Sequence, residues 1–137
     1  MFQEKILAYK LRVNEETGEV YHGYFEEIEN TLEAKQKYVG GYIEVFRLTD
    51  EIDIILNDEG KINGMKPNRA LFDNKKVLDY FVGNILCVRH NEEGDFTSIL
   101  EDDENIILRY LKPIMEVDNV YILMPEFVCS YYKNKKE

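Results

Sequence analysis

The chain has 137 residues, of which 17 are Lys or Arg and 27 are Asp or Glu, so its formal net charge is −10. With 45% hydrophobic residues it is too apolar for a disordered acidic protein. No apolar run approaches the roughly 20 residues of a membrane-spanning helix. We expect one soluble domain whose negative charge disfavours direct binding to nucleic acid or to a membrane and allows a basic protein partner.

Two cysteines, Cys87 and Cys129, are too few for a disulfide framework, which favours a reducing compartment. The N-terminal residues lack the basic start and the apolar stretch of a signal peptide. Both observations lead us to expect a cytoplasmic protein.

Alternating apolar residues predict strands in the first half of the chain, because successive side chains of a strand point to opposite faces. These strands cover residues 5–13, 19–25, 42–48 and 51–57. The first two are expected to form a hairpin around a turn at residues 14–18. In the fourth, Ile52, Ile54 and Leu56 share one face, and Asp53 points to the other.

A helix over residues 31–39 is expected between the second and third strands. Asn30 and Glu33 form an Asn version of the capping box at its start, and Gly40-Gly41 supply its end. Its apolar residues are few, namely Leu32, Tyr38 and Val39.

The second half of the chain predicts one more helix among less regular segments. The acidic first turn of residues 102–111 suits the dipole of a helix, which Pro113 would end. Gly60 is suited to a positive φ angle in the turn that follows residue 57. Before this helix we expect an edge strand at 61–65, an irregular stretch at 67–69 and a helical turn at 77–81. A buried strand at 83–90 and a turn at 91–94 are expected to follow. After the helix, residues 120–124 and 127–132 are expected to form a strand pair, a docked arm or an oligomer contact.

These elements predict an α+β fold with a mainly antiparallel sheet and about two short helices. The domain is expected to cover residues 1–132, with 101–132 as a C-terminal extension of helix and strand. Residues 133–137 form a short basic tail.

Four motifs occur in order along the chain: ENTLEAKQKYVGGYIEV at 29–45, NDEGK at 57–61, PNRAL at 67–71, and GN at 83–84 leading to GDFTS at 94–98. Over residues 28–100 they resemble an uncharacterised domain family of phages and conjugative elements in Gram-positive bacteria. The resemblance implies an accessory protein of a mobile element, and such proteins often inhibit host defence. It implies no particular chemistry.

An acidic run is the most distinctive feature of the charge distribution, because no Lys or Arg interrupts it between Arg89 and Arg109. Its members are Glu92, Glu93, Asp95, Glu101, Asp102, Asp103 and Glu104. One interpretation is a solvated turn followed by an acidic helix start. The other is a carboxylate array that imitates the phosphates of DNA and occupies the basic groove of a host defence protein.

Polar residues of the family-like motifs allow a second function, the binding of a small anionic ligand such as a nucleotide signal. The residues are Asn57, Asn68, Arg69 and Asn84. Turn chemistry explains the asparagines equally well, because Asn accepts left-handed backbone geometry. A structural or accessory role is the third alternative.

No constellation for catalysis or for a metal or cofactor emerges from the spacing of residues. His22 and His90 lie far apart, so a zinc site would need an unusual assembly with Cys87 and Cys129. Nucleophilic catalysis would need one of those cysteines beside one of the histidines. We therefore expect a binding protein and not an enzyme, with a homodimer contact at residues 127–132 if one exists.

Overall fold

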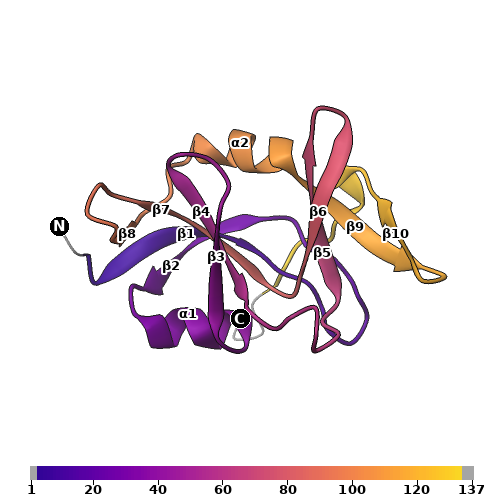
Figure 1. Cartoon of the computed structure of the whole chain (residues 1–137), viewed down its shortest axis with the longest axis horizontal. Helices are drawn as coiled ribbons and strands as arrows, with labels where there is room; N and C mark the ends of the chain where they lie inside the picture. The colour runs from indigo at the N-terminus through magenta and orange to yellow at the C-terminus, as the bar shows by residue number, and fades with distance from the viewer. Residues whose placement is uncertain (1–2, 134–137) are drawn as a thin grey trace.

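The structure, a computed structural model, describes residues 3–133 and contains two antiparallel sheets and two α-helices (Figure 1). The first sheet has the order β2-β1-β7-β4-β3, with β8 paired to the end of β7. Its strands are β1 (Lys5–Leu11), β2 (Tyr24–Glu29), β3 (Ile43–Arg47), β4 (Ile52–Asn57), β7 (Ile85–His90) and β8 (Phe96–Thr97). The predicted α+β class with mainly antiparallel strands is confirmed.

The second sheet has the order β10-β9-β5-β6 and packs beside the first. Its strands are β5 (Pro67–Asp73), β6 (Lys76–Val82), β9 (Leu111–Val117) and β10 (Val120–Leu123). The helices are α1 (Leu32–Val39) and α2 (Asp103–Tyr110), and a 3-10 helix covers Glu126–Val128. No described helix is long and apolar enough to cross a membrane.

Both faces of the first sheet are covered, which explains why all of β4 is buried. On one face, Ile55, Leu86 and Val88 pack against α1 through Val39. On the other face, the core that includes Ile54 extends to α2 and to the second sheet. Figure 1 shows α1 below the first sheet and α2 crossing above, toward the second sheet. The alternation predicted for Ile52, Asp53, Ile54 and Leu56 is confirmed, with the three apolar residues in one core cluster.

The predicted first hairpin exists, but its second strand begins later than the sequence indicates. The turn at 14–18 is present, and Val13 and Val20 form an isolated antiparallel bridge. The continuous ladder of β1 is made instead with β2, in which Lys10 pairs with Tyr24. A break at His22 and Gly23 separates the two pairings.

Gly23 lies at this break because the ring of Tyr9 occupies the space where a side chain would be. A Cβ at Gly23 would lie 2.3 Å from Tyr9 Cζ, and Tyr9 is only 1% exposed, so its ring cannot move away freely. We expect Gly23→Ala to lower the free energy of unfolding by about 2 kcal/mol, the cost of overpacking a core. Urea denaturation of Gly23→Ala in the wild-type and Tyr9→Leu backgrounds tests this, because an equal loss in both would contradict the steric explanation.

Helix α1 begins one residue later than predicted, and its cap is Thr31 instead of Asn30. Thr31 Oγ1 accepts a hydrogen bond from Ala34 N at 3.1 Å, so no capping box with Glu33 forms. The Asn30 side chain instead donates to Phe96 O at 3.0 Å and accepts a hydrogen bond from Lys35 Nζ at 2.7 Å. Gly40 ends the helix with a positive φ of 82°, as predicted.

The buried face of α1 also differs from the prediction. Leu32 is 56% exposed, whereas Lys35 is 3% exposed beside Val39. Lys35 Nζ lies 5.0 Å from the centroid of the Phe96 ring, and burial lowers its pKa. The long side chain therefore ties α1 to β8, a role that hydrophobic patterning does not indicate.

Three segments of the second half are strands or turns where the sequence predicts otherwise. Residues 67–69, expected to be irregular, begin β5, because Pro67 stands at the first position of a strand, where proline is tolerated. Residues 77–81, expected to be a helical turn, belong to β6. Residues 61–65 are mostly turn and not an edge strand, and the positive φ in this loop belongs to Gly64 and not to Gly60.

The second predicted helix is confirmed: α2 covers Asp103–Tyr110, where residues 102–111 were expected. Leu111 is extended, and Lys112 stands before a proline, a position that is disfavoured in a helix. Pro113 lies inside β9, where its carbonyl accepts a hydrogen bond from Met124 N.

Three alternatives were open for the C-terminal segment, namely a strand pair, a docked arm or an oligomer contact, and the strand pair between residues 120–124 and 127–132 does not form. β10 pairs with β9, and residues 127–132 include the end of the 3-10 helix and a bridge between Ser130 and Tyr21. The predicted basic tail falls largely on residues 134–137, which lie outside the described residues.

Candidate functional site

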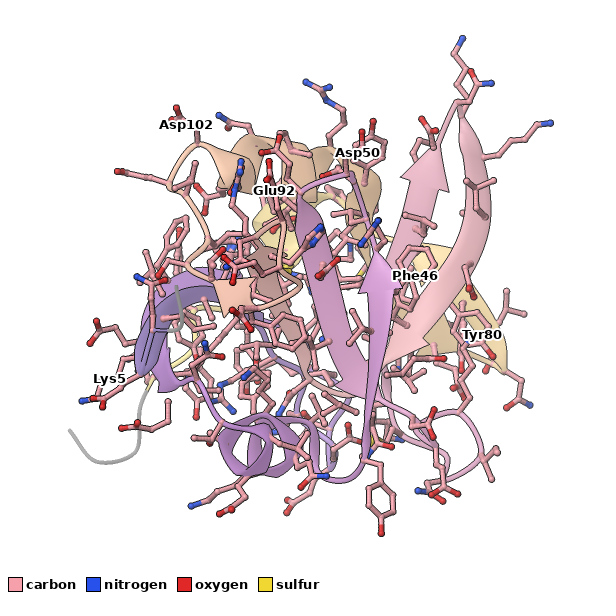
Figure 2. The ribbon with its side chains drawn as sticks, turned by 60° about the vertical axis from the view of Figure 1, so that its left-hand side comes forward. Lys5, Phe46, Asp50, Tyr80, Glu92 and Asp102 are labelled. Atoms are coloured by element: carbon pink, nitrogen blue, oxygen red, sulfur yellow. The ribbon has the colours of Figure 1, made fainter. Side chains whose placement is uncertain are left out.

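Acidic side chains from three separate segments meet at one end of the first sheet, which we call the acidic rim. The segments are adjacent because Ile52 pairs with Arg89, His90 N donates to Glu51 O, and Arg89 bonds Asp103. Figure 2 shows Asp50, Glu92 and Asp102 at this end. Its exposed or half-buried members are Asp50, Glu51, Glu92, Glu93, Asp95, Glu101 and Asp102. Glu104, the last acid of the run, instead forms a hydrogen bond with the buried Tyr9 side chain.

Asp103 belongs to the same run but is 2% exposed, so the structure places it beneath the rim. Its carboxylate accepts two hydrogen bonds from Arg89, at 2.7 Å from Nε and 2.8 Å from Nη2, and a third from Leu100 N. The Arg89 guanidinium therefore holds the pKa of Asp103 below its ordinary value. Arg89 also lies 2.7 Å from Glu51. The acidic run therefore has a positive neighbour in the folded protein, although no Lys or Arg interrupts it in the sequence.

The second set of predicted site residues is not brought together in one pocket. Asn68 and Arg69 are 0% exposed. Asn68 Nδ2 donates to Leu11 O at 2.9 Å and to Gly83 O at 2.8 Å, which joins both sheets. Asn84 Oδ1 accepts from Val13 N, so this residue also links strands.

Arg69 is a buried cation that is bound mainly by neutral groups. Nη1 donates to Asn68 Oδ1 at 2.7 Å, and Nη2 donates to Tyr21 O at 2.8 Å. The nearest carboxylate oxygen, Oε1 of Glu126, lies 3.9 Å from Nη2. Nε has no hydrogen-bond partner within the described part of the chain, and burial lowers the pKa of the guanidinium.

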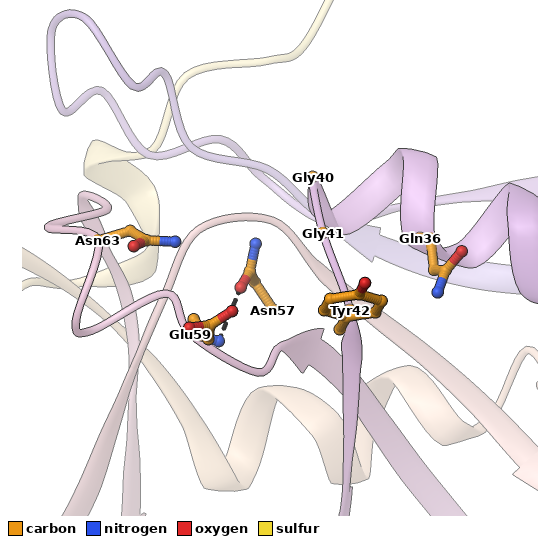
Figure 3. Close-up of a pocket in the computed structure, with 7 residues that line it drawn as sticks. All are labelled: Gln36, Gly40, Gly41, Tyr42, Asn57, Glu59 and Asn63. Atoms are coloured by element: carbon orange, nitrogen blue, oxygen red, sulfur yellow. Dashed lines mark hydrogen bonds between the residues drawn. The ribbon is translucent and has the colours of Figure 1, made fainter.

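Asn57, the fourth predicted residue, lines a pocket of about 350 Å³ in which two of the family-like motifs meet (Figure 3). Gly40-Gly41-Tyr42 form one side, and Asn57 and Glu59 form the other. Gln36 and Asn63 complete the lining. Tyr42 is 72% exposed, so an aromatic face stands beside amide and carboxylate groups.

The Asn57 amide holds this pocket together, since Nδ2 donates to Val39 O at 3.2 Å and Oδ1 accepts from Glu59 N at 2.8 Å. We expect Asn57→Ala to lower the free energy of unfolding by about 2 kcal/mol, because both backbone groups lose their partner. The exposed Asn63→Ala is the matched control and should stay within about 0.5 kcal/mol of wild type. Equal losses in thermal or urea unfolding would contradict this role of Asn57.

One cysteine and one histidine do come together, with a carboxylate that the sequence analysis missed. His22, Glu126 and Cys129 place their ligand atoms within 4.8 Å of one another. Burial raises the pKa of the Cys129 thiol to about 11, which argues against an activated nucleophile at neutral pH. No spacing rule indicates this cluster, because 106 residues separate His22 from Cys129.

The other cysteine and histidine lie elsewhere in the first sheet. Cys87 is 0% exposed in the core between the sheets, where burial raises its pKa strongly. His90 Nδ1 lies 2.9 Å from Asp53 Oδ2. The four-residue assembly that a zinc site with both cysteines and both histidines would need therefore does not form.

Comparisons with known proteins give a family and no named activity. No curated protein and no solved structure matches the chain. The family model described as a domain of unknown function, DUF3846, matches residues 11–113. This match extends beyond residues 28–100 at both ends and includes β9 up to Pro113. The chain belongs to the DUF3846 family of uncharacterised domains.

Proposed function

We propose that this protein is a non-catalytic binding protein of a phage or conjugative element that inhibits a host defence protein. According to this proposal, the protein acts in the cytoplasm of the bacterial host. Its acidic rim occupies a basic groove through which the target normally holds nucleic acid. The observation that carries the proposal is the convergence of three acidic segments at one end of the sheet.

The rim keeps a net negative charge after its neighbouring arginines are counted. The β3–β4 turn adds Asp50 and Glu51 to the acids of the run. Two arginines approach the rim within the described residues: Arg89 binds the buried Asp103 and also the rim acid Glu51, and Arg47 Nε lies 3.9 Å from Asp53 Oδ1. The remaining surface is strongly negative, which is the electrostatic complement of a basic groove.

Such a surface should act mainly by long-range attraction. The rim would raise the association rate with a basic partner, and added salt would weaken binding steeply, because exposed charges are screened over about 8 Å at physiological ionic strength. A partner that binds through apolar contacts alone would show little salt dependence.

The first experiment is an affinity pulldown of tagged protein from a lysate of a Gram-positive host, eluted with a salt gradient. Any partner is then purified and tested for competition between this protein and the nucleic acid that the partner binds. We expect a basic nucleic-acid-handling protein whose DNA or RNA complex is displaced. A specific partner that binds nucleic acid equally well in the presence of this protein would overturn the mimic model.

A charge-reversal pair then locates the contact on the rim. Glu92→Lys, Glu101→Lys and Asp102→Lys are combined in one variant. The matched control reverses the exposed acids Glu44 and Asp58, which lie at the opposite end of the first sheet, and Glu116, which lies on the second sheet. Both variants carry the same net charge. We expect the rim variant to lose at least about 100-fold in association rate and the control to lose far less. Equal losses would show that net charge, and not the rim, drives binding.

The pocket in Figure 3 favours a second candidate function, the sequestering of a small polar ligand. The exposed Tyr42 ring can stack on a flat or sugar-like group, and the amides of Gln36 and Asn63 can hydrogen-bond its edge. Calorimetry with cyclic nucleotides and nucleotide metabolites tests this function. Binding heat that is lost in Asn63→Ala and Tyr42→Ala would favour it, and no heat at high protein concentration would remove it.

Homodimerisation through the aromatic C-terminal segment stays a prediction. Phe127 is 81% exposed and Tyr131 is 78% exposed, so both are accessible to a second copy.

A further inference from the structure

Pairing between distant backbone segments holds His22 close to Cys129. Tyr21 and Ser130 form a parallel bridge, His22 N donates to Ser130 O at 2.7 Å, and Ser130 N donates to Val20 O at 3.1 Å. Cys129 is the residue before this bridge and is 7% exposed. The two side chains therefore belong to a region whose backbone is fixed before any ligand arrives.

Glu126 joins them from the start of the 3-10 helix. Its carbonyl accepts a hydrogen bond from Cys129 N at 3.1 Å, which fixes the spacing between these two residues. Its carboxylate Oε1 lies 3.6 Å from His22 Nδ1. A sulfur, an imidazole nitrogen and a carboxylate oxygen thus lie within 4.8 Å of one another.

We propose that His22, Glu126 and Cys129 bind a zinc ion that fastens the C-terminal segment to the β1–β2 region. Zinc takes these three ligand types at about 2.0–2.3 Å, and in a tetrahedral site such ligands stand about 3.3–3.8 Å apart. The separation of His22 and Glu126 already lies in this range, and rotation of half-buried side chains brings the sulfur closer. Water supplies the fourth ligand.

The charges around the site balance when the metal is bound. Coordination replaces the S–H bond of Cys129 with an S–Zn bond, and the thiol proton passes to the solvent. Zn²⁺ with one thiolate and one carboxylate is neutral, so the buried cation Arg69, whose Nη2 lies 3.9 Å from Glu126 Oε1, faces no net positive charge. Without metal, burial raises the pKa of the Cys129 thiol to about 11, and the positive charge of Arg69 acts in the opposite direction.

The site goes beyond the proposed function, because it lies on the C-terminal segment and uses no residue of the acidic rim. The sequence offers unusually direct controls for it. The chain has two His and two Cys residues, and one of each lies outside the site: His90 beside Asp53, and Cys87 in the core.

The test measures metal binding directly with the full chain. Co²⁺ is added as a spectroscopic probe, and Zn²⁺ is titrated in competition with a chromophoric chelator. We expect one ion per chain and a thiolate-to-cobalt charge-transfer band in the wild type, in Cys87→Ala and in His90→Ala. Cys129→Ala should abolish the band, and His22→Ala should weaken zinc binding by about 100-fold or more, since even changes behind a metal ligand cost 10–100-fold.

Glu126→Gln provides a further variant that keeps the size of the side chain and should also weaken binding. Because His22 is half-buried and Glu126 lies near the surface, circular dichroism and urea unfolding without metal should show both variants folded. Zn²⁺ should raise the unfolding temperature of the wild type and of His90→Ala, but not of His22→Ala. Absence of the band in the wild type, or a band that is lost in Cys87→Ala and retained in Cys129→Ala, would overturn the proposal.

Discussion

Arg69→Ala is expected to lower the free energy of unfolding by about 4 kcal/mol, the largest effect of any single substitution considered for this chain. Arg69 is 0% exposed, so its loss leaves a cavity between the two sheets. It also removes the donors that bind Asn68 Oδ1 and Tyr21 O. An acceptor left buried without a donor costs about 1–3 kcal/mol.

Arg69→Met separates the two contributions. Methionine fills most of the space but donates no hydrogen bond, and it spares the cost of burying a cation whose Nε has no partner among the described residues. We therefore expect it to be about 2 kcal/mol less destabilising than Arg69→Ala. Urea denaturation at pH 7 measures both values.

Arg109→Ala is the matched control, because Arg109 is exposed in the last turn of α2. Its loss should change the free energy of unfolding by no more than about 0.5 kcal/mol. If Arg69→Ala proved as mild as Arg109→Ala, the buried guanidinium would have no structural role.

The same residue shows why part of the fold could not be predicted from sequence. Alternation identified β1, β3 and β4, because one or both faces of these strands are apolar. Asn68 and Arg69 read as turn residues, since polar side chains are rarely fully buried. Their burial is compensated by acceptors on Leu11, Gly83 and Tyr21, which are distant in sequence.

The candidate sites also depend on contacts between residues that are distant in the sequence. The acidic run was visible as consecutive residues, but the addition of Asp50 and Glu51 depends on the pairing of β4 with β7. The cluster of His22 with Cys129 depends on a single bridge between Tyr21 and Ser130. Local patterns report which face of an element is apolar, and they carry no information about which distant loops meet.

Asp103→Asn is expected to destabilise the protein by about 3 kcal/mol at pH 7, because the Asp103 carboxylate is 2% exposed and binds Arg89 through both oxygens. Arg89 keeps its contact with Glu51, so the guanidinium is not left without any acceptor. The exposed Asp102→Asn is the control, since Asp102 makes no side-chain capping bond, and it should stay within about 0.5 kcal/mol of wild type.

The pH dependence of this difference identifies the ion pair as its cause. Arg89 lowers the pKa of Asp103 in the folded protein, so the unfolded chain binds the proton more tightly. The stabilisation is therefore complete above the ordinary aspartate pKa of about 4 and is lost as the pH falls through the lower folded value. Urea denaturation of wild type and Asp103→Asn at several pH values should show a constant difference from about pH 5 to 8 that shrinks below about pH 4. A difference that stays constant into that acidic range would mean that Asp103 acts through packing or through its bond with Leu100 N, and not through its charge.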